Sequence, residues 1–542
     1  MSPRLEIDAE SGAHAGAAPT NIKSRLLAFL AEHGSSIAWL VAVQVGVYTY
    51  FFSTLIFTNH TFPNAWVVSF PSPITRQEGR WLSDFVIWLQ GGSGVRSLQM
   101  FLATALQAVN GILFARLFGA KGRMDVMLLA LAVCLYPAFL DDYAFERYHL
   151  SFILGDTLAL CALAYCAGRP ASLVSAAVGS LLIMLSLALY QPKIAFVLLL
   201  GCCHLTAIFS SAAKKKRLSL SSALGAIAYV AAIIAAGTVL YLASSKIAIQ
   251  GTHIPRAHLN SMHEMALAIL STYKHIGTTA FPVREYLPPV LGFVPAGVVL
   301  VGGWLLLKRA MPDYLAVMLV AFLLLCIPLC ARASFIINKN TWEDAGRITY
   351  VSGYALLFFI AAGLQSPQKA KLFRGAIALF IYFFVVVDSQ ASNAAAFKTT
   401  YELSFINRIA ARIESVTPDL YSTPHALIVL GRFPALDHAK FCRFLPFESH
   451  SQSFLFEVYR QQELMNFVVG HDAFRRPSPK EVKAALAATE GRKPWPSSES
   501  VFVLKKSVVV LLEKYRPDLP HTWSVRKKKK AHPSGPPRHA AG

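Results

Sequence analysis

Charged residues are scarce in this chain. Only 15% of its 542 residues are charged, whereas 55% are hydrophobic. A typical soluble domain has about 25% charged residues, and it lacks repeated apolar runs long enough to cross a bilayer core of about 30 Å. The composition therefore excludes an ordinary soluble globular protein and predicts a membrane protein with several spans.

Cysteine is also scarce, and the sequence has no metal-binding pattern. Of the eight cysteines, only Cys442 lies away from the apolar segments, so no disulfide framework is available. Cys202, Cys203 and His204 are adjacent near the end of one apolar segment, where we interpret the cysteines as small buried hydrophobic residues. We expect no metal site and no cofactor, and the sequence leaves open whether a divalent metal ion is needed.

Eleven apolar segments predict a mostly α fold with about 11 transmembrane helices. The segments are 37–57, 97–117, 125–140, 151–167, 172–190, 194–210, 222–243, 288–307, 313–331, 348–364 and 374–389. The preceding stretch, 21–33, predicts a short amphipathic helix on the inner membrane surface.

Acidic residues are missing from one set of loops, and this absence predicts the orientation. The short connections on one side of the expected membrane hold twelve Lys and Arg residues but no Asp or Glu. These connections are 118–124, 168–171, 211–219, 308–312 and 365–374. Dense cations close to span ends mark cytoplasmic loops. We therefore expect a cytoplasmic N-terminus and, after an odd number of spans, a C-terminal part on the outer side.

The formal net charge of +21 does not indicate a nucleic-acid-binding protein. The cations are divided between the inner loops and the C-terminal region, and no stretch interleaves basic with aromatic residues as nucleic-acid surfaces do. We expect the lipid bilayer as a partner and no nucleic acid.

The C-terminal region has the composition of a soluble domain. A helical pattern covers 401–416, and β-type runs occur at 425–430, at 467–470 and as a pair at 501–504 and 508–512. We interpret the region as a small α/β domain. The expected parts of the chain are a cytoplasmic segment 1–35, a transmembrane domain 36–390, an outer α/β domain 391–525 and a basic, disordered tail 526–542.

The first group of candidate site residues lies in the first outer loop. Glu78 is the only acidic residue between positions 58 and 83, and it stands between Arg76 and Arg80, just before Trp81. A carboxylate between two guanidinium groups indicates a base beside phosphate-binding cations. A surface ion pair next to an interfacial tryptophan explains the pattern about as well.

The second group comprises Asp141, Asp142, Arg147 and His149 and leads into a span that contains Asp156. If the stretch is helical, one stripe carries Asp142, Glu146, His149 and Asp156. A carboxylate inside a span needs a partner or a wet cavity, so Asp156 indicates a functional site. The alternatives are a structural hydrogen bond for Asp156 and simple loop solvation for the aspartate pair.

The third group, Tyr190, Gln191 and Lys193, occupies a tight outer hairpin between two apolar segments. Interfacial placement alone would explain Lys193, but it does not explain why tyrosine and glutamine stand together. Farther along, Arg347 follows two carboxylates at the mouth of a span, which indicates either a site or a solvated ion pair.

Together these motifs resemble the bacterial Gtr type II family of membrane glucosyltransferases, which modify O-antigen. The resemblance rests on the acid before Gly79 and Arg80, on the acidic and aromatic stretch 141–149, and on the Leu-Ser-Leu-Ala-Leu-Tyr-Gln run at 185–191. In order and topology it extends over residues 37–390.

The resemblance implies a GT-C-type glycosyltransferase in the bacterial inner (plasma) membrane, with a periplasmic C-terminal domain. Such an enzyme moves a hexose, expected to be glucose, from a polyprenyl-phosphate carrier to a cell-surface glycan such as the O-antigen of lipopolysaccharide. The polyprenyl-phosphate sugar and the glycan acceptor are the expected partners.

The polar residues fit this chemistry. A phosphodiester leaving group departs as an anion and is stabilised by cations. The cations available for it are Arg80, Arg147, Lys193 and Arg347. The acceptor hydroxyl needs a carboxylate base, for which Glu78 is the first candidate and Asp141 and Asp142 are the second. The other expected substrate-binding residues are Trp81, His149, Asp156, Tyr190 and Gln191.

Two other functions stay open. A lipid-linked oligosaccharide flippase or other transporter would also need polar residues within the membrane, but the internal repeats of many transporters are not evident. A polysaccharide assembly protein without catalysis would place its specificity in the C-terminal domain.

Overall fold

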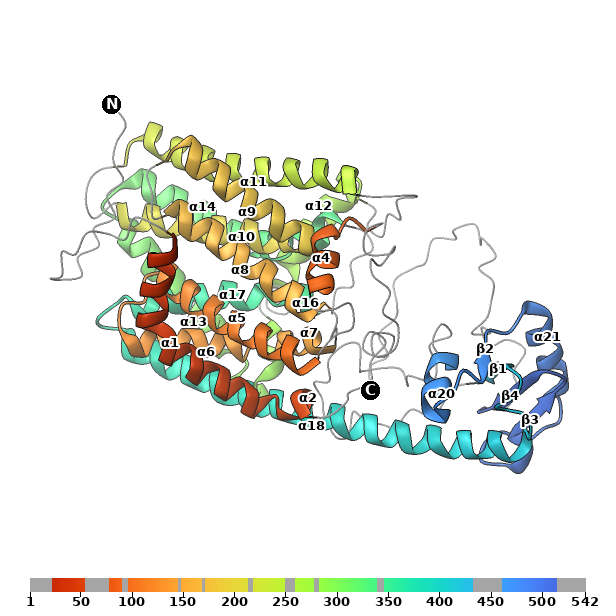
Figure 1. The fold of residues 1–542 in the computed structure, drawn as a ribbon. Helices are drawn as coiled ribbons and strands as arrows, with labels where there is room; N and C mark the ends of the chain where they lie inside the picture. Colours follow the sequence, from red (N-terminus) through yellow and green to blue (C-terminus); the bar gives the residue numbers. More distant parts are fainter. Residues whose placement is uncertain are drawn as a thin grey trace. The chain divides into compact units, whose positions relative to one another are not determined.

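The computed structural model describes residues 22–53, 78–89, 96–144, 148–167, 171–212, 218–248, 259–276, 282–338, 346–431 and 461–513. The chain forms two compact units (Figure 1). The first comprises residues 1–396 with 439–450, and the second comprises 397–438 with 451–542. The expected tail 526–542 lies outside the described residues.

The first unit is helical throughout its described part. Its helices are α1 (Ile22–Val47), α2 (Thr49–Ser53), α4 (Trp81–Leu89), α5 (Arg96–Leu117), α6 (Arg123–Cys134), η2 (Pro137–Phe139), α7 (Leu140–Ala144), α8 (His149–Ala167), α9 (Leu173–Leu189), α10 (Lys193–Ala212), α11 (Leu220–Ala248), α12 (Met262–Lys274), η4 (Pro282–Tyr286), η5 (Pro289–Leu291), α13 (Val294–Ala310), α14 (Tyr314–Ala331), α15 (Ala333–Ile337), α16 (Gly346–Thr349), α17 (Val351–Leu364) and α18 (Ala370–Val416), which continues into the second unit.

Within the described residues, nine helices are long and apolar enough to cross a membrane. Two further apolar helices, α9 and α17, are shorter than 18 residues. Every predicted span overlaps a helix, and nine of the described helices have the length and composition of membrane spans, which supports the multi-pass membrane class, whereas the number eleven stays a prediction. The short α17 is buried along its whole length, because it lies inside the bundle and packs against α13.

Close helix contacts depend on small residues. A Cβ atom added at Gly302 of α13 would lie 2.7 Å from the backbone oxygen of Phe359 in α17. A Cβ atom at Gly111 of α5 would meet the backbone of Ala130 in α6 at the same distance. Small residues let membrane helices approach each other closely, and these two positions bring α17 and α6 into the core.

The first span differs from its predicted position. The prediction placed a surface helix at 21–33 and a span at 37–57, but α1 is one continuous helix whose apolar part is Leu27–Val47. Glu32 and His33 lie within this helix. Arg116 of α5 forms an ion pair with Glu32, so these polar residues are accommodated within α1.

The second unit contains a four-stranded sheet with strand order β2-β1-β4-β3 in its described part. Its elements are β1 (His425–Leu430), α20 (Gln461–Val469), β2 (Phe474–Arg475), α21 (Pro479–Ala488), η8 (Ser498–Ser500), β3 (Val501–Leu504) and β4 (Ser507–Leu511). β1 runs parallel to β2 and β4, and β3 pairs with β4 in an antiparallel hairpin. Ala485 of α21 packs on Ile428 and Val509, which closes a small apolar core over the sheet.

Three of the four predicted strands are confirmed, with β4 shifted by one residue. The predicted strand at 467–470 is wrong, because this run is the end of helix α20. Gln461, Leu464 and Met465 are buried at helical spacing, and Gly470, with φ +69°, ends the helix in the left-handed conformation that glycine favours. The fourth strand of the described sheet is instead the two-residue β2, which pairs with β1.

Candidate functional site

The first loop and the Tyr190–Gln191 turn meet in the structure. The Arg80 Nε donates a hydrogen bond to Gln191 Oε1 at 3.2 Å, and the Gln191 side chain in turn donates to the backbone oxygen of Glu78. The Arg80 guanidinium carbon lies 4.8 Å from the ring centroid of Tyr190. Two motifs that are 111 residues apart in the sequence are thus joined by direct contacts.

Gly79 makes this approach possible. Its φ is +79°, and an added Cβ would lie 3.0 Å from the Tyr241 hydroxyl of α11 and 3.3 Å from the Gln191 amide nitrogen. Both the backbone conformation and the crowding require glycine. The sequence between Glu78 and Arg80 therefore fits closely against the end of α9 and against α11.

Glu78 and Arg80 also form an ion pair. Arg80 Nη1 lies 3.4 Å from Glu78 Oε2, and the exposed fractions of the two side chains are 20% and 7%. Trp81 follows as the first residue of α4, which is anchored to the same turn because Ser83 donates a 2.7 Å hydrogen bond to the Leu189 oxygen. The arrangement places a shielded carboxylate directly beside a partly accessible guanidinium group.

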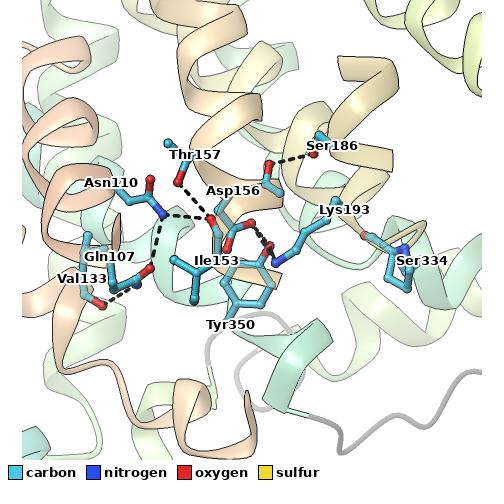
Figure 2. A network of polar contacts seen from close by, with 12 residues as sticks. Gln107, Asn110, Val133, Ile153, Asp156, Thr157, Ser186, Lys193, Ser334 and Tyr350 are labelled. Atoms are coloured by element: carbon cyan, nitrogen blue, oxygen red, sulfur yellow. Dashed lines mark hydrogen bonds and ion pairs between the residues drawn. The ribbon is translucent and has the colours of Figure 1, made fainter. Parts of the chain in front are cut away.

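A closed triangle of hydrogen bonds joins Asp156, Lys193 and Tyr350 (Figure 2). The Lys193 ammonium lies 2.8 Å from Asp156 Oδ1 and donates to the Tyr350 hydroxyl at 2.9 Å, and Tyr350 donates to Asp156 Oδ1 at 2.6 Å. The side chains of Asp156 and Lys193 are 0% and 1% exposed. The ammonium charge is therefore neutralised inside the protein, which weakens the expectation that Lys193 binds a lipid phosphate.

Backbone contacts hold this triangle in place, as Figure 2 shows. Ser186 of α9 donates to the Gly155 oxygen at 2.8 Å, and Ser334 of α15 donates to the Pro192 oxygen at 2.9 Å. Gly155 packs beside the aliphatic part of Lys193, with its hypothetical Cβ 3.5 Å from Lys193 Cγ. Because Lys193 is two residues after Gln191, the triangle fixes the same turn that binds Arg80.

The stripe predicted from Asp142 to Asp156 is not formed by one helix. α7 ends at Ala144, Tyr148 is not helical, and α8 begins at His149, so Asp142 belongs to a different helix from His149 and Asp156. Asp141 and Asp142 are nevertheless buried, with 2% and 0% exposure. Surface solvation therefore does not explain the aspartate pair.

His149 lies in an aromatic layer next to α7. Its ring centroid is 4.5 Å from that of Tyr143, and Tyr143 packs against Tyr48 of α1 at 4.6 Å. On another side of the core, Phe139 packs on Tyr350 at 5.1 Å. Phe139 lies two residues before Asp141, so the segment that precedes the aspartate pair contacts Tyr350 of the triangle.

The side chains of three cations named in the sequence analysis are not described. Arg147 lies outside the described residues, and so does Arg76. Arg347 belongs to α16, three residues before Tyr350, but only its backbone is described. The roles expected for Arg147 and Arg347 stay predictions.

The sequence analysis missed Tyr350 and Asp388. Tyr350 gave no signal, because one tyrosine at the start of an apolar segment is common at membrane interfaces. Asp388 of α18 is fully buried and accepts a 2.8 Å hydrogen bond from the Tyr48 hydroxyl. Its position at the end of the predicted span 374–389 was a usable signal, since a carboxylate inside a span indicates function.

The described residues contain no group of three or more His, Cys, Asp or Glu side chains that could hold a metal ion. The chemistry that their polar groups offer is proton transfer by carboxylates and binding of anions by guanidinium groups.

The fold and these polar clusters define a multi-pass membrane protein with a buried polar site beneath its first loop. The family model of the glucosyl transferase GtrII matches residues 67–387, which is more than half of the chain. The chain therefore belongs to this glucosyltransferase family, as its motifs predicted. No curated protein and no solved structure matches it.

Proposed function

We propose that the protein transfers glucose from a polyprenyl-phosphate carrier to a glycan, such as the O-antigen of lipopolysaccharide, at the outer face of the bacterial inner membrane. Membership of a glucosyltransferase family supports the reaction class. The observation that carries the proposal is the contact of Arg80 with Gln191 and Tyr190, which brings an anion-binding group and a carboxylate together. In this orientation the N-terminus is cytoplasmic and the sheet-containing unit is periplasmic.

Arg80 is the first candidate for binding the phosphate of the lipid-linked donor. Its Nε binds Gln191 and its Nη1 faces Glu78, so Nη2 is the group left to bind an oxyanion within the described contacts. Guanidinium binds phosphate more specifically than ammonium does, because its donors lie in a planar fork. Arg147 and Arg347 are proposed to add positive charge to the same phosphate, whereas Lys193 acts by fixing the turn.

Glu78 is the proposed base for the acceptor hydroxyl. Its carboxylate is shielded and lies beside Arg80, and a carboxylate within hydrogen-bond reach of the acceptor hydroxyl can take its proton. Asp141 and Asp142, both buried, are the second candidates. His149, Trp81 and the Tyr190 ring are proposed to contact the substrates.

The test is an assay of glucose transfer by the purified full-length protein, with radiolabelled polyprenyl-phosphate glucose and lipopolysaccharide. Glu78→Gln keeps the size of the side chain and should lower transfer by about 10²–10⁴-fold, the usual contribution of general base catalysis. Glu32→Gln is the matched control, because Glu32 also pairs with an arginine but lies in α1.

The Glu78→Gln variant could instead keep nearly parental activity while an Asp141→Asn or Asp142→Asn variant is inactive. That result would assign the base to Asp141 or Asp142 of α7. If the parental protein moves the labelled lipid across a bilayer without forming a glycan product, the enzyme proposal is wrong and a flippase explains the data.

A further inference from the structure

A second group of polar atoms surrounds Tyr286 of η4 and takes no part in the contacts of Glu78 and Arg80. Three aromatic rings lie next to each other here: Tyr136 and Tyr286 at 5.9 Å, Tyr136 and Phe384 at 5.5 Å, and Tyr286 and Phe384 at 6.3 Å between centroids. They come from the residue preceding η2, from η4 and from α18. Tyr286 is half-buried, whereas Tyr136 and Phe384 are buried.

Asp388 faces this aromatic group. It follows Phe384 by four residues on α18 and therefore lies on the same helix face. Burial and the nearby carboxylates of Glu285, Asp388 and Asp141 raise the pKa of the Tyr286 phenol. Asp388 and Asp141, from α18 and α7, thus lie within electrostatic reach of one phenol.

Two buried hydrogen-bonding atoms in this group have no partner among the described residues. Asp388 is 0% exposed, and only its Oδ2 is engaged, by the Tyr48 hydroxyl, while Oδ1 accepts no hydrogen bond. The Tyr136 hydroxyl is likewise buried and unpaired within the described part of the chain. A buried polar atom without a partner destabilises the fold, and native proteins keep few of them.

Two other buried carboxylates of the unit have a cationic partner. Asp156 is paired with Lys193, and Asp125 binds Arg374 at 2.7 Å. Asp388 receives only a neutral phenol donor from the described residues, so one of its oxygens keeps its full capacity to accept hydrogen bonds. An acceptor oxygen and a donor hydroxyl near a half-buried aromatic residue match the surface of a sugar, whose hydroxyls both donate and accept.

We propose that Asp388 and Tyr136 form a hydroxyl-binding subsite for a hexopyranose, with the Tyr286 ring beside the sugar. A hydroxyl of the sugar donates to Asp388 Oδ1, and another accepts from the Tyr136 hydroxyl. The inference rests on the proposed function. The hexopyranose is either the glucose being transferred or a sugar of the acceptor glycan, and the two arms of the test separate these sources.

The experiment measures KM and kcat of the full-length protein in lipid nanodiscs for Asp388→Asn and Tyr136→Phe. One arm varies polyprenyl-phosphate glucose and the other varies lipopolysaccharide. We expect KM for one of the two to rise about tenfold for each variant, with little change in kcat, since the loss of one hydrogen bond costs about that much in affinity. A rise in the donor arm assigns the subsite to the transferred glucose, and a rise in the acceptor arm assigns it to the acceptor.

Thermal unfolding separates recognition from a structural role. Tyr136→Phe removes an unpaired buried hydroxyl, so its unfolding temperature should equal or exceed that of the parent. Tyr382→Phe, on an exposed face of α18, and Asp125→Asn are the matched controls and should leave both KM values unchanged. Unchanged KM values in both arms, or a lower unfolding temperature with a parallel loss of kcat, would overturn the subsite.

A second measurement keeps the subsite testable if the parental protein transfers no glucose. Binding of methyl glucopyranoside is then followed by saturation-transfer NMR. Binding by the parent that both variants lose supports the subsite even though the proposed reaction has failed. Absence of binding by the parent overturns it.

Discussion

Asp156 and Asp388 are both fully buried carboxylates in the helical unit, but their surroundings differ. Asp156 contacts an ammonium group and a phenol, which together close a triangle with Lys193 and Tyr350. Asp388 contacts one phenol, that of Tyr48. The comparison separates a carboxylate with a cationic partner from one whose described hydrogen-bond partner is a neutral phenol.

The largest effect is expected when the Asp156 pair is broken. Lys193→Met leaves an unmatched buried carboxylate, which should lower the free energy of unfolding by about 3–5 kcal/mol. Adding Asp156→Asn removes that charge and still offers an acceptor to Tyr350, so the double variant should recover most of the loss. Thermal unfolding in nanodiscs measures both. A single variant as stable as the parent would contradict the structural role of the pair.

The matching change at the other carboxylate is Tyr48→Phe. It removes the only described donor to Asp388, and we expect a loss of about 1–3 kcal/mol in the free energy of unfolding. Asp388→Asn should cost less, because an amide keeps an acceptor for Tyr48 while removing the charge. Equal losses of unfolding free energy for Tyr48→Phe and Lys193→Met would show that the fold depends equally on the partners of both carboxylates.

Gly79→Ala tests how closely the first loop must approach α11. The added methyl group would meet the Tyr241 hydroxyl at 3.0 Å in a backbone conformation with φ +79°. We expect a cost of about 1–2 kcal/mol in stability from the backbone alone. Glucose transfer should fall further than stability, because Arg80 would be displaced from Gln191. Gly297→Ala, which has open space around it, is the control.

The smallest effect concerns a solvent-exposed carboxylate in the second unit. Hydrogen bonds from Arg475 lower the pKa of Glu481 to about 2, from an ordinary value near 4.5. A depressed pKa stabilises the folded state above about pH 4.5, and the contribution is lost as the pH falls toward about 2. Because both side chains are partly exposed, Glu481→Gln should cost at most about 1 kcal/mol at pH 7. Unfolding curves of parent and variant should converge as the pH is lowered through this window.

The sequence predicted the helical membrane class, the family and three strands, because apolar runs and β-type runs are local signals. It also selected Glu78, Arg80 and Gln191, although only the folded chain shows that they touch. Tyr350 was missed because its importance comes from Lys193 and Asp156, which lie far away in the sequence. The predicted helical stripe from Asp142 to Asp156 was wrong, because helical spacing of polar residues does not show where a helix is interrupted. The run at 467–470 was misread because Phe and Val suit both strands and the end of a short amphipathic helix.

The length of α17 bears on how the protein assembles. Its 14 residues rise about 21 Å, less than the roughly 30 Å thickness of the hydrocarbon layer, so its ends do not both reach the headgroups. At one end Tyr350 binds Asp156, and at the other Gln365 accepts from Arg309 and donates to the Phe118 oxygen. All three partners are synthesised earlier than α17. The helix therefore needs a bundle that is already in place, and its insertion during biogenesis should wait for α8, α10 and α13.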